Sequence, residues 1–187
     1  MRIISGKLKG KNISFLKSPT TRPLKDSVKE NIFNIIVHSK LLKVNMKNSN
    51  VLDLYSGIGS FGLECISRGA KKTTFVEKDK NVAEILKKNL FSLGIIKNAT
   101  VIVDEIRNFI EKNLSEKFEI IFLDPPFADE TYIQELRSIK QKKNYKKDHV
   151  IIIHRERKSF ENFKDILSPI LTKQYGRSKI IFGKFLR

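Results

Sequence analysis

The chain has 187 residues, 40% hydrophobic and 30% charged, which fits one folded domain of ordinary size and excludes a disordered tail. It holds no run of about 18 apolar residues, no apolar signal segment at its start and only one cysteine, so we expect a cytoplasmic protein without membrane association, disulfide or bound metal. The net charge of +17 favours a polyanionic partner.

The first part of the chain predicts a small extension ahead of a larger domain. Residues 2–15 carry two short apolar stretches around a Lys/Gly-rich turn, which predicts a β-hairpin. Residues 18–23 contain two prolines and are interpreted as a linker. A helix is expected over residues 25–39, with the capping-box pattern Ser27-Val28-Lys29-Glu30 near its start. We place the extension at residues 1–24 and the main domain at 25–187.

From residue 50 onward, strand and helix patterns alternate, which predicts an α/β fold with a doubly wound, mostly parallel, seven-stranded Rossmann-like sheet. No helix separates the last two strands, so an antiparallel C-terminal edge is expected. Residues 118–123 are fully apolar, which predicts a central strand. The expected strands are 51–55, 73–76, 99–103, 118–123, 149–154, 166–171 and 180–185, and the expected helices are 59–68, 79–93, 105–113 and 130–140.

Basic residues concentrate at the two ends of the chain. The net charge is +9 over residues 1–49, −2 over 50–130 and +10 over 131–187. These flanks predict a surface that binds nucleic acid, and a merely solvated lysine-rich surface is the alternative. A lysine-rich loop is expected over residues 140–147. The candidate RNA contacts are Lys7, Lys9, Lys11, Arg22, Lys142 and Lys143.

A glycine loop follows the first strand of the alternating region. Gly57, Gly59 and Gly62 match the G-x-G-x-x-G spacing of dinucleotide-binding folds, which leaves an NAD-dependent oxidoreductase open. Asp53 precedes the glycines and would repel a pyrophosphate. Glu77, after the second strand, is placed to accept hydrogen bonds from ribose hydroxyls, and Asp104, after the third, to bind an adenine amino group. Three carboxylates at three strand ends favour the cationic nucleoside S-adenosylmethionine.

The segment Asp124-Pro125-Pro126-Phe127 directly follows the central strand. Two prolines fix the backbone and remove two N–H donors, which leaves the carboxylate and nearby carbonyls as acceptors. Acceptors of this kind suit the exocyclic NH2 of a nucleobase, which could then attack the sulfonium methyl. Phe127 could stack on an extruded base. His154 ends a strand and is interpreted as a residue at the domain edge.

The sequence resembles the bacterial 16S ribosomal RNA guanine-N2 methyltransferases of the RsmD type over nearly its whole length. The similar segments are Arg2-Ile3-Ile4-Ser5-Gly6 with Lys9-Gly10, residues 22–30 with 32–35, residues 53–59 with Leu63-Glu64, residues 67–70 with Glu77 and Asp79, and residues 124–127. Two departures are Leu24, where the family usually has Thr, and Ile58, where Ser or Thr is usual.

The resemblance implies transfer of a methyl group from S-adenosylmethionine to the N2 amine of one guanine in 16S rRNA. The substrate would be the small ribosomal subunit or its assembly intermediate. We expect the enzyme to be a monomer. Open alternatives are an adenine-N6 methyltransferase acting on DNA or RNA, and a non-catalytic RNA-binding protein. The expected catalytic residues are Asp124, Pro125, Pro126 and Phe127. The expected cofactor-binding residues are Asp53, Tyr55, Ser56, Gly57, Gly59, Glu77, Lys78, Asp104 and Glu105.

Overall fold

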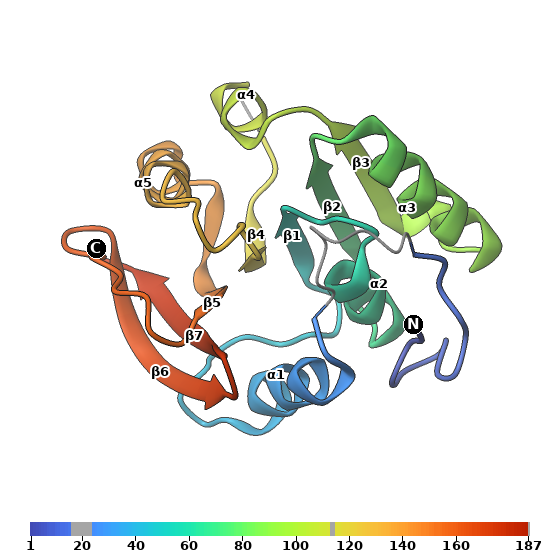
Figure 1. The fold of residues 1–187 in the computed structure, drawn as a ribbon, viewed down its shortest axis with the longest axis horizontal. Helices are drawn as coiled ribbons and strands as arrows, with labels where there is room; N and C mark the ends of the chain where they lie inside the picture. The colour runs from blue at the N-terminus through green and yellow to red at the C-terminus, as the bar shows by residue number, and fades with distance from the viewer. Residues whose placement is uncertain (16–23, 113–114, 187) are drawn as a thin grey trace.

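The computed structural model describes residues 1–15, 24–112 and 115–186. Within these ranges the strands form one seven-stranded sheet in the order β3-β2-β1-β4-β5-β7-β6 (Figure 1). Pairing is parallel from β3 to β5 and antiparallel for β7 and β6, so the predicted fold class is confirmed. The strands are β1 Asn50–Leu54, β2 Lys72–Glu77, β3 Ala99–Val103, β4 Phe118–Leu123, β5 Tyr145–Glu156, β6 Leu167–Tyr175 and β7 Ser178–Phe185.

Helices cover both faces of the sheet. The helices are α1 Asp26–His38, α2 Ser60–Ser67, α3 Lys80–Ser92, α4 Ile106–Glu111 and α5 Tyr132–Lys142, with a short 3-10 turn at Ile96–Asn98. Figure 1 shows α1, α2 and α3 on one side and α4 and α5 on the other. Side chains of β4 alternate between the two layers: Ile120 packs toward α1 and α2, and Ile121 toward α4 and α5. This two-sided burial explains the fully apolar sequence of the strand.

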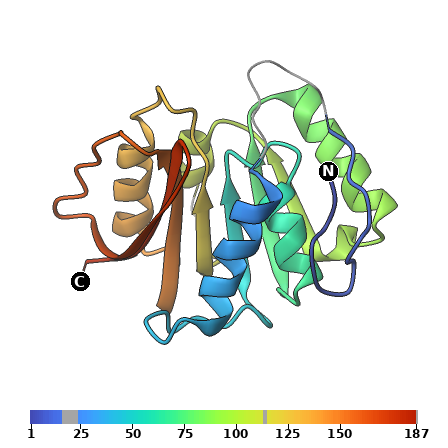
Figure 2. The same cartoon turned by 60° about the horizontal axis from the view of Figure 1, so that its bottom comes forward.

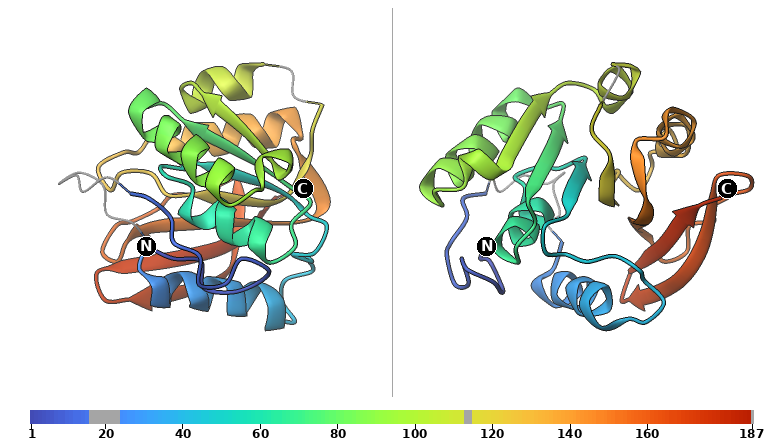
Figure 3. Two further views of the ribbon diagram at one scale, coloured as in Figure 1. Left: turned by 90° about the vertical axis from the view of Figure 1, so that its right-hand side faces the viewer. Right: turned by 180° about the vertical axis from the view of Figure 1, so that it is seen from behind.

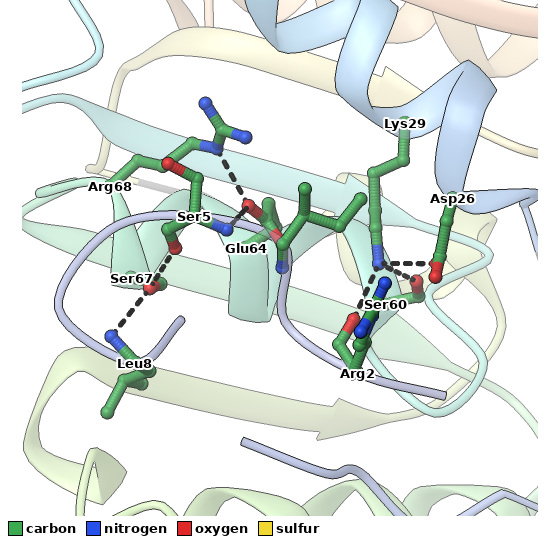
Figure 4. Close-up of polar contacts among 10 residues, drawn as sticks. Arg2, Ser5, Leu8, Asp26, Lys29, Ser60, Glu64, Ser67 and Arg68 are labelled. Carbon is green, nitrogen blue, oxygen red and sulfur yellow. Dashed lines mark hydrogen bonds and ion pairs between the residues drawn. The ribbon is translucent and has the colours of Figure 1, made fainter. Parts of the chain in front are cut away.

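The N-terminal segment folds back on itself as predicted, but it forms no regular strands. An antiparallel bridge between Arg2 and Asn12 and three backbone hydrogen bonds join its two arms, and the segment lies along α2 and α3 (Figures 2 and 3). Other backbone donors of the segment bind side chains of α2. The fully buried Glu64 carboxylate accepts from the amides of Ile4 at 2.8 Å and Ser5 at 2.9 Å. Ser67 Oγ accepts from the amide of Leu8 at 3.0 Å (Figure 4).

The start of α1 is held by the buried side chain of Lys29 and not by the predicted capping box. The helix begins at Asp26 and has no side-chain cap, so the capping-box prediction at Ser27 is wrong. Lys29 is fully buried, and its Nζ donates to the carbonyl of Arg2 and to Ser60 Oγ, both at 3.3 Å (Figure 4). Desolvation lowers its pKa. The start of α1 is thus tied to the N-terminal segment.

The predicted lysine loop at 140–147 is also wrong. Helix α5 extends to Lys142, one left-handed residue, Lys143, ends it, and β5 begins at Tyr145. The sequence predicted a shorter helix and a later strand, because the last residues of α5 and the first residues of β5 are largely exposed and do not continue the apolar pattern. The predicted linker at 18–23 lies outside the described residues. In the described part of the chain no helix is both long and apolar enough to cross a membrane.

Replacing Glu64 tests the attachment of the N-terminal segment. Glu64→Ala leaves two backbone amides and Arg68 Nε, which lies 2.8 Å from the carboxylate, without their acceptor. We expect the free energy of unfolding to fall by roughly 2–4 kcal/mol in urea denaturation. Glu84→Ala is the control, because Glu84 is an exposed glutamate paired only with Lys87. Equal losses for the two variants would contradict this account.

Candidate active site

A cavity of about 1030 Å³ opens at the carboxyl edge of the parallel strands. The segments that follow β1, β2, β3 and β4 contribute most of its wall, because the carboxyl ends of parallel strands meet at one edge. Phe15 of the N-terminal segment and Leu24, ahead of α1, also line it. The predicted site residues on its wall are Asp53, Tyr55, Ser56, Gly57, Glu77, Lys78, Asp104, Glu105, Asp124, Pro125, Pro126 and Phe127.

Glu77 shapes the glycine loop. Its Oε2 accepts from the amide of Gly57 at 2.8 Å, and its Oε1 accepts from the amide of Asp79 at 2.9 Å. Each carboxylate oxygen can accept a further hydrogen bond, so these contacts leave room for a ribose hydroxyl.

Gly59 closes the loop against the core and does not line the cavity. Its φ is +86°, and a Cβ there would lie 2.4 Å from Leu86 Cδ1, so only glycine fits. Gly59 therefore contributes to the site only by allowing the backbone of the loop to take this path. Ile58, one of the two departures from the family pattern, packs partly buried against the cluster beneath α2 and α3.

Asp53 is a buried carboxylate between β1 and α2. Its side chain is 1% exposed, and Oδ2 accepts from the amide of Gly62 at 2.9 Å. Desolvation raises its pKa well above the ordinary value, and the bond from Gly62 opposes that shift. A buried carboxyl group at the cavity wall would gain from a cationic ligand group.

The cavity is acidic although the protein is strongly basic. Eight carboxylate side chains and two cationic ones, Lys78 and Arg107, line it. Ser56 Oγ is buried and has no hydrogen-bond partner among the described residues, so it is available to bind a ligand. These carboxylates attract the positively charged sulfonium and amine of S-adenosylmethionine and repel the pyrophosphate of a dinucleotide. The acidic wall therefore disfavours the oxidoreductase interpretation.

Asp104 is already engaged in the protein. Its Oδ1 accepts from Asn108 Nδ2 and its Oδ2 from Lys112 Nζ, both at 2.9 Å. The hydrogen bond from Lys112 lowers the pKa of this carboxyl group, and the bond from Asn108 adds to the shift. Asp104 therefore stays ionised beside the cavity, where it could still accept from an amino group.

Two residues of β5 position the Asp124–Phe127 segment. His154 Nδ1 lies 2.8 Å from Asp124 Oδ1, and the imidazole meets the Phe127 ring edge-on at 5.7 Å between centroids. Asp124 Oδ2 has no partner among the described residues and remains available as an acceptor. His154 lines the cavity, so its interpretation as a domain-edge residue is wrong.

Arg155 holds the backbone of the same segment. Its Nη1 donates to the carbonyl of Pro126 at 3.0 Å and its Nη2 to that of Phe127 at 2.9 Å. The guanidinium also lies 4.6 Å from the centre of the Tyr132 ring. These two carbonyls are therefore occupied, which corrects the predicted rim of free acceptors and leaves the Asp124 carboxylate as its main member.

Tyr55 and Glu135 form a second polar pair on the wall. Tyr55, with a positive φ of 58°, places its Oη 2.6 Å from Glu135 Oε2 and 3.3 Å from Asp129 Oδ2. Burial raises the pKa of both the tyrosine and Glu135. Glu135 and His154 were not predicted, because side chains on α5 and β5 reach the cavity only through the tertiary fold.

The predicted RNA-binding lysines do not line the cavity, although Lys142 Nζ donates to the carbonyl of Glu111, a residue of its wall, at 2.6 Å. The amide of Lys7 donates to the carbonyl of Ser67 at the C-terminal end of α2, which places Lys7 and its neighbour Lys9 near the amino edge of the sheet. Lys142 and Lys143 precede β5, whose first residue pairs with the first residue of β4, so they lie at the amino edge too. Lys11 lies on the returning arm of the N-terminal segment, and Arg22 lies outside the described residues.

The fold and the acidic cavity define an S-adenosylmethionine-dependent methyltransferase. Residues 1–184 match a family described as "Conserved hypothetical protein 95". Ribosomal RNA small subunit methyltransferase D of Buchnera aphidicola subsp. Baizongia pistaciae is 31% identical and covers 100% of this chain and 91% of its own length. Its namesake from the Acyrthosiphon pisum subspecies is 35% identical over 83% of this chain and 78% of its own length.

A solved structure agrees with these sequence matches. "Putative methyltransferase yhhF" of Escherichia coli superposes with a TM-score of 0.84 at 25% identity, covering 99% of this chain and 97% of that one. The chain therefore belongs to the ribosomal RNA small subunit methyltransferase D family, which confirms the resemblance seen in its sequence.

Because Asp53 is buried, replacing it should change the stability of the protein by an amount that depends on pH. The folded protein retains a proton on Asp53 above the ordinary carboxyl pKa of 3.8, so this group lowers the free energy of unfolding as pH rises through the window above that value. Asp53→Asn keeps an acceptor oxygen and removes the charge. We expect it to raise the free energy of unfolding at pH values well above 3.8, and the gain to shrink as the pH falls toward 3.8. Urea denaturation across pH checks this, and a gain independent of pH would contradict it.

Proposed function

We propose that this chain transfers the methyl group of S-adenosylmethionine to the exocyclic N2 amine of a guanine in 16S rRNA. The observation that carries the proposal is the match to a named small-subunit rRNA methyltransferase over 100% of this chain and 91% of that protein. The substrate is the small ribosomal subunit or its assembly intermediate, and the enzyme acts as a cytoplasmic monomer.

The cofactor-side residues hold a cationic nucleoside. When bound, S-adenosylmethionine supplies an electrophilic methyl group on a positively charged sulfur. Asp53 and the glycine loop face its amino-acid end, Glu77 accepts from the ribose hydroxyls, and Asp104 binds near the adenine. The acidic wall stabilises the positive charge, and the buried Ser56 hydroxyl gains a partner.

The Asp124–Phe127 segment holds the base. Asp124 Oδ2 accepts a hydrogen bond from the exocyclic NH2 and thereby shifts its lone pair from the ring toward the methyl group. His154 holds the other oxygen of that carboxylate, and Arg155 fixes the loop behind it. Phe127, 39% exposed at the cavity wall, stacks on the extruded guanine. Transfer would break the carbon–sulfur bond, whose electron pair would stay on the sulfur of S-adenosylhomocysteine. The nitrogen would then carry an extra proton, which Asp124 Oδ2 accepts and passes to water.

Replacing Asp124 tests the base-binding role. Asp124→Ala removes the acceptor for the NH2 group, and we expect kcat to fall by roughly 100- to 1000-fold, the range found when one group that binds a reacting atom is removed. Binding of S-adenosylhomocysteine, measured by calorimetry, should stay within about threefold. Glu130→Ala is the control, because Glu130 is an exposed acid in the same loop that does not line the cavity. Normal turnover by Asp124→Ala would overturn the mechanism.

The product nucleoside tests the substrate assignment. Labelled S-adenosylmethionine is offered with unmethylated small subunits, naked 16S rRNA and DNA, and the modified nucleoside is identified after digestion. We expect N2-methylguanosine from the small subunits. N6-methyladenine would overturn the base assignment and establish the adenine-N6 alternative. No label from protein that binds S-adenosylhomocysteine would overturn the proposed substrate class.

A further inference from the structure

An exposed aromatic residue and three cations lie together beyond the end of β5. Phe160 is 92% exposed, and Arg157 and Lys158 are exposed in the same loop. The amide of Arg157 donates to the carbonyl of Arg177 at 2.8 Å, which brings the β6–β7 turn beside this loop. The three cations have no ion-pair partner among the described residues. We call Arg157, Lys158, Phe160 and Arg177 the rim platform.

The rim platform lies at the same edge of the sheet as the cavity. β5 runs parallel to β4, which ends at Leu123 just before Asp124, and Glu156 pairs with Ser178 at the start of β7. The β6–β7 turn and the segment after β4 therefore both lie at the top of Figure 2. His154, which lines the cavity, precedes Arg157 by three residues of extended chain, about 10 Å.

A buried ionic network fixes the backbone on both sides of Phe160. Glu161 is largely buried, and its carboxylate binds Lys179 Nζ at 2.6 Å and lies 3.6 Å from Arg155 Nε. Ser159 Oγ donates to the carbonyl of Glu156 at 2.6 Å, and Lys179 Nζ also donates to the carbonyl of Ser159. Since Arg155 binds the carbonyls of Pro126 and Phe127, the platform and the base-binding segment share one support.

The charge of the cavity decides where a substrate's phosphates can bind. Eight carboxylates inside the cavity repel phosphate, so a strand that inserts one base must keep its backbone outside. Of the lysines expected to bind RNA, Lys7, Lys9 and Lys143 lie toward the opposite edge of the sheet. The rim platform instead places cations and a stacking surface at the edge of the sheet where the cavity opens.

We propose that the rim platform binds single-stranded RNA beside the target nucleotide. Phe160 stacks on a neighbouring base, and Arg157, Lys158 and Arg177 contact the flanking phosphates. This inference rests on the proposed function for its choice of RNA. It assigns the contact that holds the strand while the target base occupies the cavity.

Binding to RNA without cofactor tests the platform. The probe is a single-stranded RNA of about 12 nucleotides, with small ribosomal subunits as a second ligand. Phe160→Ala should raise the Kd for the RNA by roughly 5- to 100-fold, the loss expected for one base–aromatic stack. Phe160→Tyr should bind like the original protein. Phe91→Ala is the control, because Phe91 is 76% exposed on α3 and far from the platform in the sheet order.

The salt dependence tests the cations. Lys158→Ala should flatten the plot of log K against log salt by about 0.7, the value for one phosphate contact on a single strand. Lys147→Ala is its control, because Lys147 is an exposed lysine near the start of β5, at the opposite edge. S-adenosylhomocysteine binding should be unchanged in every variant.

Two results would overturn the platform. An RNA Kd within twofold of the original for Phe160→Ala would exclude stacking. If Phe160→Ala loses binding to small subunits but keeps binding to RNA, the partner of the platform is a ribosomal protein instead. Methyl transfer is assayed separately: RNA binding that depends on Phe160 in a protein that forms no N2-methylguanosine would overturn the proposed function and leave the platform intact.

Discussion

The parallel hydrogen-bonded ladder from β2 through β1 and β4 to β5 is the constraint on which the site depends. It places the carboxyl ends of four strands at one edge, so Glu77, Asp53, Asp124 and His154 reach one cavity from distant parts of the sequence. The same pairing gathers acidic groups in a protein of net charge +17. Most basic side chains lie on the outer surface, so the region that suits a cation is separate from the region that suits phosphate.

Most of the fold could be predicted from the sequence because hydrophobic periodicity reports burial directly. The strand at residues 118–123 matches the observed bounds because both its faces pack under helices. The failures lie where long-range contacts replaced local ones. Ser27 does not cap α1, and residues 2–15 form a single bridge without regular strands, while Lys29 and Glu64 bind that segment from α1 and α2. A local pattern carries no information about a partner some sixty residues away.

The site was predictable where its residues directly follow strands. Asp53, Glu77 and Asp124 could be placed on one edge by counting strands, and all three line the cavity. His154 could not be assigned, because its contact with Asp124 requires β5 to pair beside β4. The position of the basic residues in the fold could not be predicted for a related reason. Charge can be counted along the chain, but the edge of the sheet to which it belongs depends on where α5 ends and β5 begins.

The long-range attachment of the N-terminal segment has a consequence for synthesis. The amide of Ser14 binds Asn89, and the amides of Ile4 and Ser5 bind Glu64, so this segment is made 59 to 75 residues ahead of its partners. At about 5–20 residues per second, this segment waits for several seconds without its native contacts. The segment therefore cannot reach its native contacts until Glu64 and Asn89 have been made.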